Sequence, residues 1–217
     1  MKRLAIVAAA LAFAAVTGLA MLELGPAAID PRTPVVDHLA QSGVSHPVTA
    51  VLLNYRGYDT LLEIAVLLLA LLAIFAVAGT SAALPARPAH PVTRNLARVA
   101  APLAIVVAVY LLWAGAFRPG GAFQAGAVLA AAAVLLHLAG LLNGWGPPVF
   151  RLRLGLAAGF AVFLTVAAVL TLRGGLLEYP PAAAGELILL VEAGLTFSLG
   201  LILAGLFLGL AREDASR

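Results

Sequence analysis

The sequence predicts an all-α, polytopic integral membrane protein, and its composition is the first observation that does so. Of the 217 residues, 63% are apolar and 11% are charged, whereas an ordinary soluble domain has roughly 45–50% and about 25%. A soluble domain of this size could not bury so much apolar surface. A soluble enzyme, a disordered chain and a nucleic-acid-binding domain are therefore excluded. The chain has no cysteine, which excludes disulfides and thiolate metal sites.

The second observation is six charge-poor runs, each long enough to cross a hydrocarbon core, which takes about 20 residues. Pro85 should end the second helix near Ser81, and the Gly144–Pro148 run predicts a turn after the fourth. Only the sixth run contains charges, Glu186 and Glu192. The expected spans are residues 4–22, 64–86, 99–117, 122–142, 154–172 and 183–210.

The distribution of cations is the third observation, and it predicts the orientation. With six spans, one side of the membrane holds nine of the 13 cations and the other holds four. Because cytoplasmic loops retain Lys and Arg, both termini are expected in the cytoplasm. The nine are Lys2, Arg3, Arg87, Arg94, Arg98, Arg151, Arg153, Arg212 and Arg217; the four are Arg32, Arg56, Arg118 and Arg173.

The first run has two interpretations. Lys2-Arg3, an apolar stretch and small residues at Thr17–Ala20 are also typical of a cleavable secretory signal. The run is longer than the 7–15 apolar residues usual in a signal, so a retained anchor is preferred. A mature N-terminus near Glu23 would indicate cleavage.

Two modules are expected along the chain. Residues 1–83 would form two helices joined by an outer loop, residues 23–60, with a short helix near residues 35–41. Residues 84–95 carry Pro85, Pro88 and Pro91 and predict an extended linker. Residues 96–217 would form a four-helix module. No internal repeat supports an inverted-repeat transporter.

Glu192 is the ionisable residue whose position within a membrane span is hardest to explain. It lies near half the membrane depth of the last span, with Thr196 one turn further on the same face. A charged group at the centre costs roughly 2.5–3.5 kcal/mol on insertion scales. Glu192 is therefore a candidate proton or cation relay, and the alternative is a hydrogen-bonded residue that holds helices together.

Two further polar positions are candidates for an ion path. If the second helix starts near Tyr55, Arg56, Asp59, Thr60 and Glu63 share one face at the outer edge. They would either handle ions or simply cap the helix and fix the loop. His137, in the fourth span, is either a proton-relay member or a helix-to-helix hydrogen-bonding group.

The connection between the third and fourth spans contains Pro119, Gly120 and Gly121, which predict a tight structural turn. It is not a phosphate-binding loop, because it lacks the Lys-Ser/Thr pair and a preceding strand. No catalytic triad, zinc motif or haem ligand pair is evident. We expect no catalytic residue, no metal and no cofactor on this chain.

Two stretches support a resemblance to known families. The run Tyr55-Arg56-Gly57-Tyr58-Asp59-Thr60, within residues 48–64, resembles the E subunit of membrane-bound hydrogenases and the end of the large A subunit of Mrp-type sodium/proton antiporters. Arg98, Gly115 and the run from Pro119 to Gly126 resemble the MnhB (MrpB) subunit of those antiporters. That family usually has Gly-His-x-x-Pro-Gly-Gly-Gly-Phe here, and Ala116 stands in place of its His. Residues 190–194 are similar to the family's last-helix carboxylate region.

The resemblance implies an accessory, non-catalytic membrane subunit of a multi-subunit cation/proton antiporter, or of a related hydrogenase-like ion pump. Its partners would be large antiporter-like subunits and small C-, F- and G-type subunits, in a bacterial or archaeal cell membrane. Any redox cofactor would belong to other chains. Two alternatives stay open: a purely structural scaffold subunit, and a stand-alone six-helix transporter.

Overall fold

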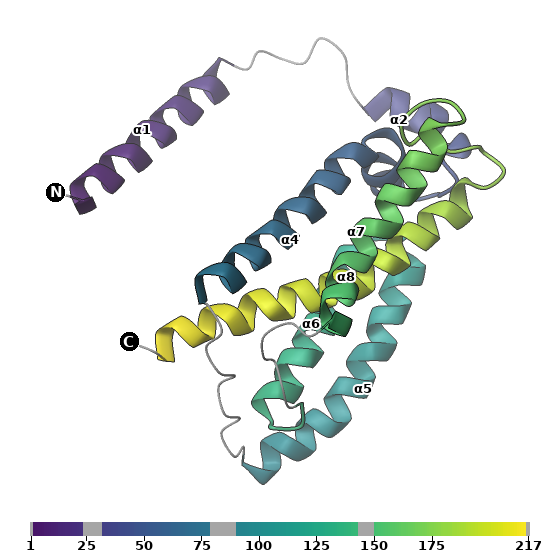
Figure 1. Cartoon of the computed structure of the whole chain (residues 1–217). Helices are drawn as coiled ribbons and strands as arrows, with labels where there is room; N and C mark the ends of the chain where they lie inside the picture. Colours follow the sequence, from purple (N-terminus) through teal and green to yellow (C-terminus); the bar gives the residue numbers. More distant parts are fainter. Residues whose placement is uncertain (1, 24–31, 79–89, 143–149, 216–217) are drawn as a thin grey trace. The chain divides into compact units, whose positions relative to one another are not determined.

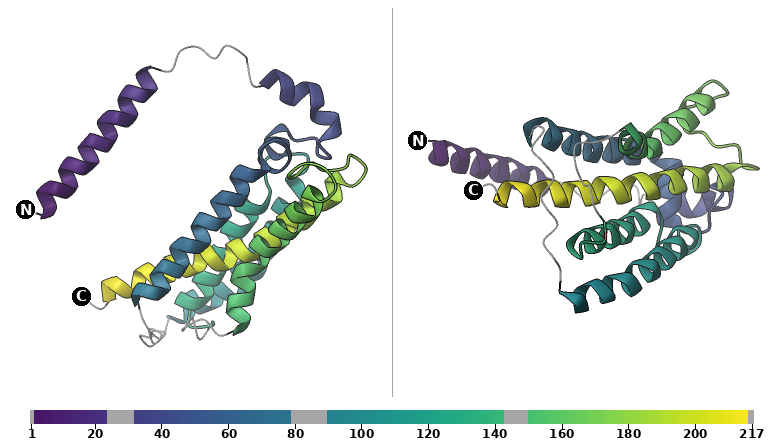
Figure 2. Two further views of the ribbon diagram at one scale, coloured as in Figure 1. Left: turned by 45° about the horizontal axis from the view of Figure 1, so that its top comes forward. Right: turned by 60° about the horizontal axis from the view of Figure 1, so that its bottom comes forward.

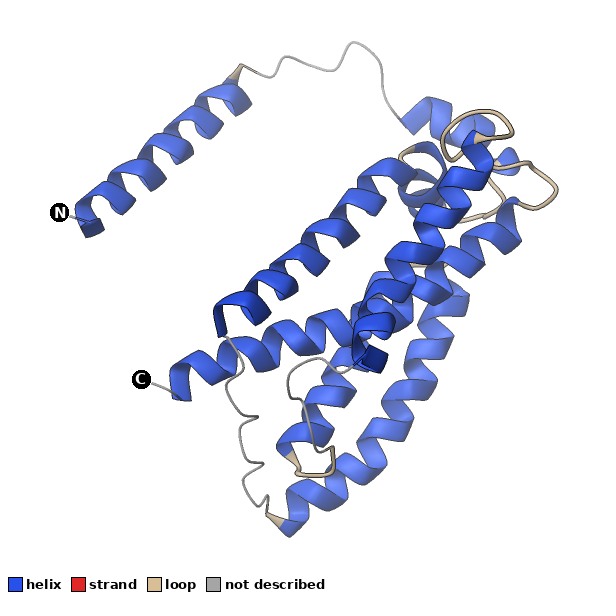
Figure 3. Cartoon of the chain, in the orientation of Figure 1, coloured by secondary structure: helices blue, strands red, loops and turns tan. Residues whose placement is uncertain are grey.

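The computed structural model describes residues 2–23, 32–78, 90–142 and 150–215, and within these ranges the chain is helical with no strand (Figure 3). This confirms the all-α prediction. The chain divides into two units, Met1–Pro34 and Val35–Arg217, and each is described by itself.

The first unit contains one long apolar helix, α1 (Lys2–Leu22) (Figure 1). Its large apolar side chains, from Val7 to Leu22, are exposed within the unit, as expected of a helix whose surroundings are lipid or another subunit. α1 coincides with the first expected span.

The second unit holds the remaining helices. A short helix, α2 (Arg32–His38), leads into it from the first unit and continues as the single 3-10 turn η1 (Leu39–Gln41). The other elements are α3 (Pro47–Ala50), the π-helix η2 (Val51–Tyr55), α4 (Gly57–Ala78), α5 (Pro91–Ala114), α6 (Ala122–Leu138), α7 (Phe150–Thr171) and α8 (Ala184–Ala215).

Four helices in the described part of the chain are long and apolar enough to cross a membrane. They are Gly57–Val77, Pro91–Ala114, Phe150–Thr171 and Ala184–Gly209. Val7–Leu22 and Ala122–Leu138 are apolar but shorter. The expected spans thus coincide with helices, and the polytopic, helical character of the protein is confirmed.

Helix α8 forms the centre of the second unit. It packs against α6 on one side and against α4 and α7 on the other, and α5 packs on α6 (Figure 2). Ile188, Val191, Leu195, Leu199 and Ile202 on α8 are almost fully buried. These positions recur at steps of three and four, the spacing that keeps one helix face turned into a core.

Contacts between α8 and its neighbours are close. A Cβ atom added at Gly126 of α6 would lie 2.7 Å from the Cβ of Leu199, so α6 and α8 approach each other closely at Gly126. On the α7 side, the Ser198 hydroxyl donates a hydrogen bond of 2.6 Å to the carbonyl of Leu156.

Several expected boundaries differ from the structure. α4 begins at Gly57 rather than Tyr55, because the preceding residues form the π-helix and Arg56 forms a turn. α5 begins at Pro91, since proline is well accommodated in a first helical turn. The last residues of the expected linker are therefore helical; its earlier residues, and the Gly144–Pro148 turn, lie outside the described residues.

Candidate functional site

One end of the second unit gathers the beginnings of α4, α6 and α8 and the ends of α5 and α7 (Figure 1). We call it the loop end. Residues 42–56 lie against it: the backbone nitrogens of Ser45 and His46 donate to the carbonyl of Ala116, which follows α5, over 2.9 and 3.1 Å. Gly43 lies against Gly185 at the start of α8. The segment is thus fixed to elements more than 65 residues away in the sequence.

The segment 42–56 is held in shape by its own polar side chains. The hydroxyl of Ser42 bonds to the carbonyl of Leu39, and the amide of Asn54 donates to the carbonyl of Ser42 over 3.0 Å. The Thr49 hydroxyl donates to the carbonyl of Gly115 over 2.5 Å. Because these groups are satisfied locally or by α5, the segment can lie against apolar helices without unpaired polar groups.

The π-helix and the first turn of α4 are joined by Thr60, whose hydroxyl donates to the Leu52 carbonyl over 2.7 Å. Thr60 is 2% exposed. A π-helical turn widens the backbone and is frequent at functional sites. Here it directs Thr60 inward, while Arg56 and Asp59 form an ion pair with each other at the surface.

The predicted turn at Pro119–Gly121 is present, and it does more than connect two helices. Gly121 has a φ of 103°, a conformation that side chains rarely adopt. Its nitrogen donates to the carbonyl of Leu111 over 2.9 Å, which closes the turn onto α5. Since glycine has no side chain, Gly121 leaves the N-terminus of α6 without a capping group of its own.

Glu192 of α8 supplies that group. Its Oε1 atom accepts a hydrogen bond from the backbone nitrogen of Ala122, the first residue of α6, over 3.4 Å. The residue is 4% exposed. An anion at a helix N-terminus is favoured by the helix dipole and by the free N–H groups there. In the described part of the chain, the carboxyl group is therefore held by a backbone N–H group and not by a cation.

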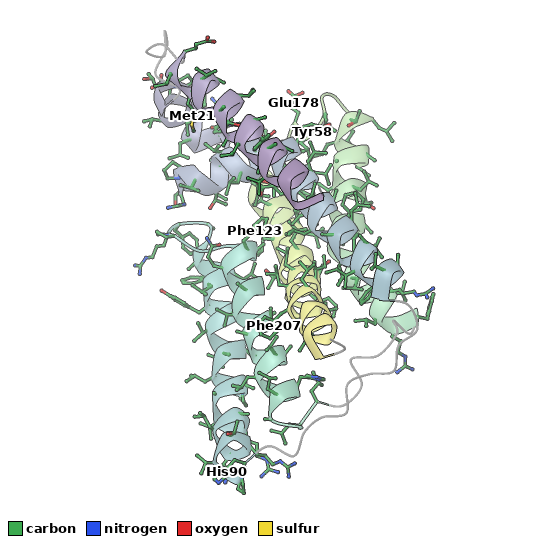
Figure 4. The ribbon with its side chains drawn as sticks, turned by 90° about the vertical axis from the view of Figure 1, so that its left-hand side faces the viewer. Met21, Tyr58, His90, Phe123, Glu178 and Phe207 are labelled. Atoms are coloured by element: carbon green, nitrogen blue, oxygen red, sulfur yellow. The ribbon has the colours of Figure 1, made fainter. Side chains whose placement is uncertain are left out.

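Glu192 opens onto a cavity of about 230 Å³ at the loop end. Its walls come from three parts of the chain: residues 46–53 with Thr60, residues 119–124, and Glu192 with Leu195. Phe123, labelled in Figure 4, contributes to the second wall. The polar side chains in the walls are His46, Thr49, Thr60, Gln124 and Glu192. A buried carboxyl group in a cavity with hydroxyl and imidazole groups is suited to exchange a proton or to contact a small cation.

The structure does not bring the other expected path residues to this cavity. Thr196 is buried, but its hydroxyl bonds to the carbonyl of Glu192 within α8 and does not line the cavity. Glu63 is exposed on α4. His137 is near the other end of α6, about 22 Å along the helix from Ala122 at 1.5 Å per residue. The polar cluster expected on one face is also divided, since Thr60 faces the cavity whereas Glu63 faces outward.

Three residues of the cavity walls could not be recognised from the sequence: His46, Thr49 and Gln124. The order of the chain separates His46 and Thr49 from Glu192 by more than 140 residues. Their polar character in an outer loop is ordinary, so composition gave no reason to single them out. One feature of the sequence indicated local structure here: Pro47 is suited to begin a helix, which places His46 directly before that helix.

The fold and site define a helical membrane protein with a buried carboxyl group at a helix N-terminus. Residues 92–211, more than half of the chain, match the family described as a domain related to the MnhB subunit of Na+/H+ antiporters. The chain belongs to this family. No curated protein sequence matches it.

Two solved structures are similar over nearly the whole chain. One is a chain of the membrane-bound sulfane sulfur reductase, an archaeal respiratory membrane complex; the TM-score is 0.71 at 21% identity, covering 96% of this chain and 97% of that one. The other is a chain of the Mrp complex from Dietzia sp. DQ12-45-1b; the TM-score is 0.70 at 22% identity, covering 97% of this chain. In the second case the present chain spans 26% of the length of its match. At these identities the likeness is one of fold.

Proposed function

We propose that this chain is an accessory membrane subunit of a multi-subunit cation/proton antiporter or a related ion-pumping complex, in which Glu192 exchanges a proton or a cation in transit. The observation that carries this proposal is the Glu192 carboxyl group, almost fully buried at the N-terminus of α6 and lining a cavity. The family match and the two similar chains, both from membrane complexes, support the setting.

The proposed topology has six spans with both termini in the cytoplasm of a bacterial or archaeal cell. The positive-inside bias supports it, and α1 and α6 supply the two spans beyond the four long apolar helices. With this orientation the loop end, and the cavity in it, faces the outside of the cell.

The proposed module order begins with residues 1–83, a part like the E chain of membrane-bound hydrogenases or the end of MrpA, fused to the MnhB-type part. The similarity to solved chains over 96% and 97% of this sequence supports a single chain that holds both parts. Partners would be large antiporter-like subunits and small C-, F- and G-type subunits. Glu63 and the exposed apolar side chains of α4, such as Val66 and Leu69, are suited to contact them. The chain would carry no catalytic chemistry of its own.

The geometry gives the exchange a defined physical basis. When ionised, the Glu192 carboxylate is stabilised by the Ala122 N–H and the dipole of α6. Protonation removes that charge and weakens the hydrogen bond, since bonds to charged acceptors are the stronger ones. The carboxyl group can therefore alternate between a charged state held by α6 and a neutral state turned to the cavity.

A purely structural role for Glu192 is the second candidate, and the same hydrogen bond favours it, because capping α6 stabilises the fold whether or not protons move. Glu192→Gln separates the two. The amide oxygen of Gln accepts the Ala122 N–H, but the amide does not titrate.

The test is antiport in membrane vesicles that contain the whole complex. The proposed role predicts that Glu192→Gln assembles in normal amounts and loses antiport. Normal antiport in a normally assembled complex would leave only the structural role. A third possibility, a stand-alone transporter, predicts ion flux by the purified chain alone in liposomes.

A further inference from the structure

The cavity at Glu192 is not complete within the MnhB-related domain. That domain covers residues 92–211, whereas His46, Thr49 and Thr60 lie outside it and form one wall. The preceding segment is therefore part of the site rather than a cover for it.

His46 is held at the site by its backbone and faces a single neighbouring hydroxyl. Its nitrogen donates to the Ala116 carbonyl over 3.1 Å, and its Nδ1 atom is 3.5 Å from the Thr49 hydroxyl oxygen. The Thr49 hydroxyl hydrogen is already donated to Gly115, so its oxygen can act only as an acceptor toward the ring. This arrangement favours a proton on Nδ1, in either the neutral or the charged ring. The side chain is half-buried, in contact with both the cavity and the surface.

Among the described residues, His46 and Glu192 are the titratable side chains in the cavity walls. Of the charged residues close in sequence to the wall residues, Arg56 and Asp59 are paired with each other, and Glu63 and Arg118 are exposed. The cavity, at about 230 Å³, has room for several water molecules at about 30 Å³ each. Imidazole ordinarily exchanges protons near neutral pH, which carboxyl groups in water do not.

We propose that His46 is the group through which protons pass between the water at the loop end and the carboxyl group of Glu192. The imidazolium gives a proton to water in the cavity, that water protonates the Glu192 carboxylate, and the neutral ring takes a new proton from the surface water. The reverse sequence releases a proton. No other reactant is consumed. This inference rests on the proposed function, because it gives Glu192 its access route.

The experiment uses the whole complex in membrane vesicles with His46→Ala and His46→Gln. We expect the antiport rate to fall by about tenfold or more, in keeping with the loss of a proton-transfer group, with normal amounts of complex. Imidazole added at the loop-end side should restore the rate of His46→Ala, and imidazole on the other side should not. His90→Ala is the matched control, since His90 is exposed at the start of α5 (Figure 4) and outside the cavity; its rate should be normal and unaffected by imidazole.

The outcomes distinguish this inference from the proposed function. Normal antiport in both His46 variants, with loss in Glu192→Gln, would overturn the route and leave the function of Glu192 intact. Normal antiport in all three would overturn both. A slow rate that imidazole does not restore would assign His46 a structural role and also overturn the route.

Cysteine labelling keeps the proposal testable if the His46 variants fail to assemble. The chain contains no cysteine, so a single one can be introduced. Thr49→Cys, in the cavity wall, should react with a small membrane-impermeant thiol reagent from the loop-end side. Thr196→Cys is equally buried but lies outside the cavity walls and should not react. An unreactive Thr49→Cys would mean that water does not reach the cavity, and the route would be wrong.

Discussion

The Glu192 side chain of α8 caps the backbone nitrogen of Ala122 at the start of α6, 70 residues earlier in the chain. Helices usually take their N-terminal cap from the residue just before them. Here that residue is Gly121, which has no side chain to offer, and the cap comes from the central helix instead. This hydrogen bond therefore links the position of α6 to the position of the Glu192 carboxyl group.

Gly121→Ala should disturb this arrangement directly. A Cβ atom at residue 121 would lie 2.6 Å from Oε1 of Glu192, and the φ of 103° is unfavourable for alanine. We expect a loss of about 1–3 kcal/mol in stability, together with slower antiport because the carboxyl group is displaced. The control is Gly18→Ala in α1, where nothing lies within 4 Å. Equal thermal stability for the two variants would contradict the geometry at Gly121.

Glu192→Leu should be less stable than Glu192→Gln. Leucine leaves the buried Ala122 N–H without its acceptor, at a cost of about 1–3 kcal/mol, whereas glutamine keeps an oxygen in the same place. The melting temperatures of the two purified variants in detergent provide the measurement. If they melt together, the hydrogen bond at 3.4 Å contributes nothing to the fold.

Ser198→Ala tests the contact between α7 and α8. The Ser198 hydroxyl is fully buried and bonds to Leu156 across the two helices. Its loss should lower the stability by about 0.5–1.5 kcal/mol. Thr165→Ala is the comparison, because the Thr165 hydroxyl is exposed and bonds only within α7. A larger effect at Thr165 would mean that the contact between the helices is unimportant.

Tyr179→Phe should protect the chain at alkaline pH. Tyr179 precedes α8, is 6% exposed, and its hydroxyl has no hydrogen-bond partner among the described residues. Burial raises the pKa of Tyr179 from 10.0 to about 12. Because the folded chain holds the Tyr179 proton more tightly than the unfolded chain, this contribution to stability is intact below pH 10 and is lost as the pH rises toward about 12. A change of this size in the pKa corresponds to about 2–3 kcal/mol.

The phenylalanine variant does not titrate at residue 179, so its stability should fall less over this range. Thermal unfolding of both forms from neutral pH to pH 12 measures the difference. Below pH 10 the variant should be as stable as the parent chain or slightly more so, because an unpaired buried hydroxyl is removed. Parallel loss of stability in the two forms would show that Tyr179 ionises as freely in the folded chain as in the unfolded one.

The helices could be predicted from the sequence, because membrane spans are apolar over their whole length and, apart from Glu186 and Glu192, the charged residues lie in the connections and at the two ends of the chain. The sequence also sufficed to single out Glu192, since a carboxyl group deep in a span has no ordinary explanation. The boundaries near Tyr55 were wrong because a π-helix is defined by backbone hydrogen bonds such as that from Arg56 to Val51, which leave no periodic pattern in the sequence.

The walls of the cavity could not be predicted, because they form by packing of distant segments. Nothing in the run from His46 to Thr49 shows that it will lie on Gly115 and Ala116. Only the folded chain brings the backbone nitrogen of His46 to the carbonyl of Ala116. By contrast, Glu63 and His137 were singled out as unusual, yet neither lines the cavity.

The three-part construction of the cavity has a consequence for how the protein can be divided. The residues of one wall precede residues 79–89 in the sequence, and the residues of the other two walls follow them. In one chain the two parts are always present in equal number and at a high effective concentration, so the cavity forms without a bimolecular step. Two separate chains would have to find each other in the bilayer first, and an excess of the part that carries Glu192 would leave copies of the cavity without the wall that contains His46, Thr49 and Thr60.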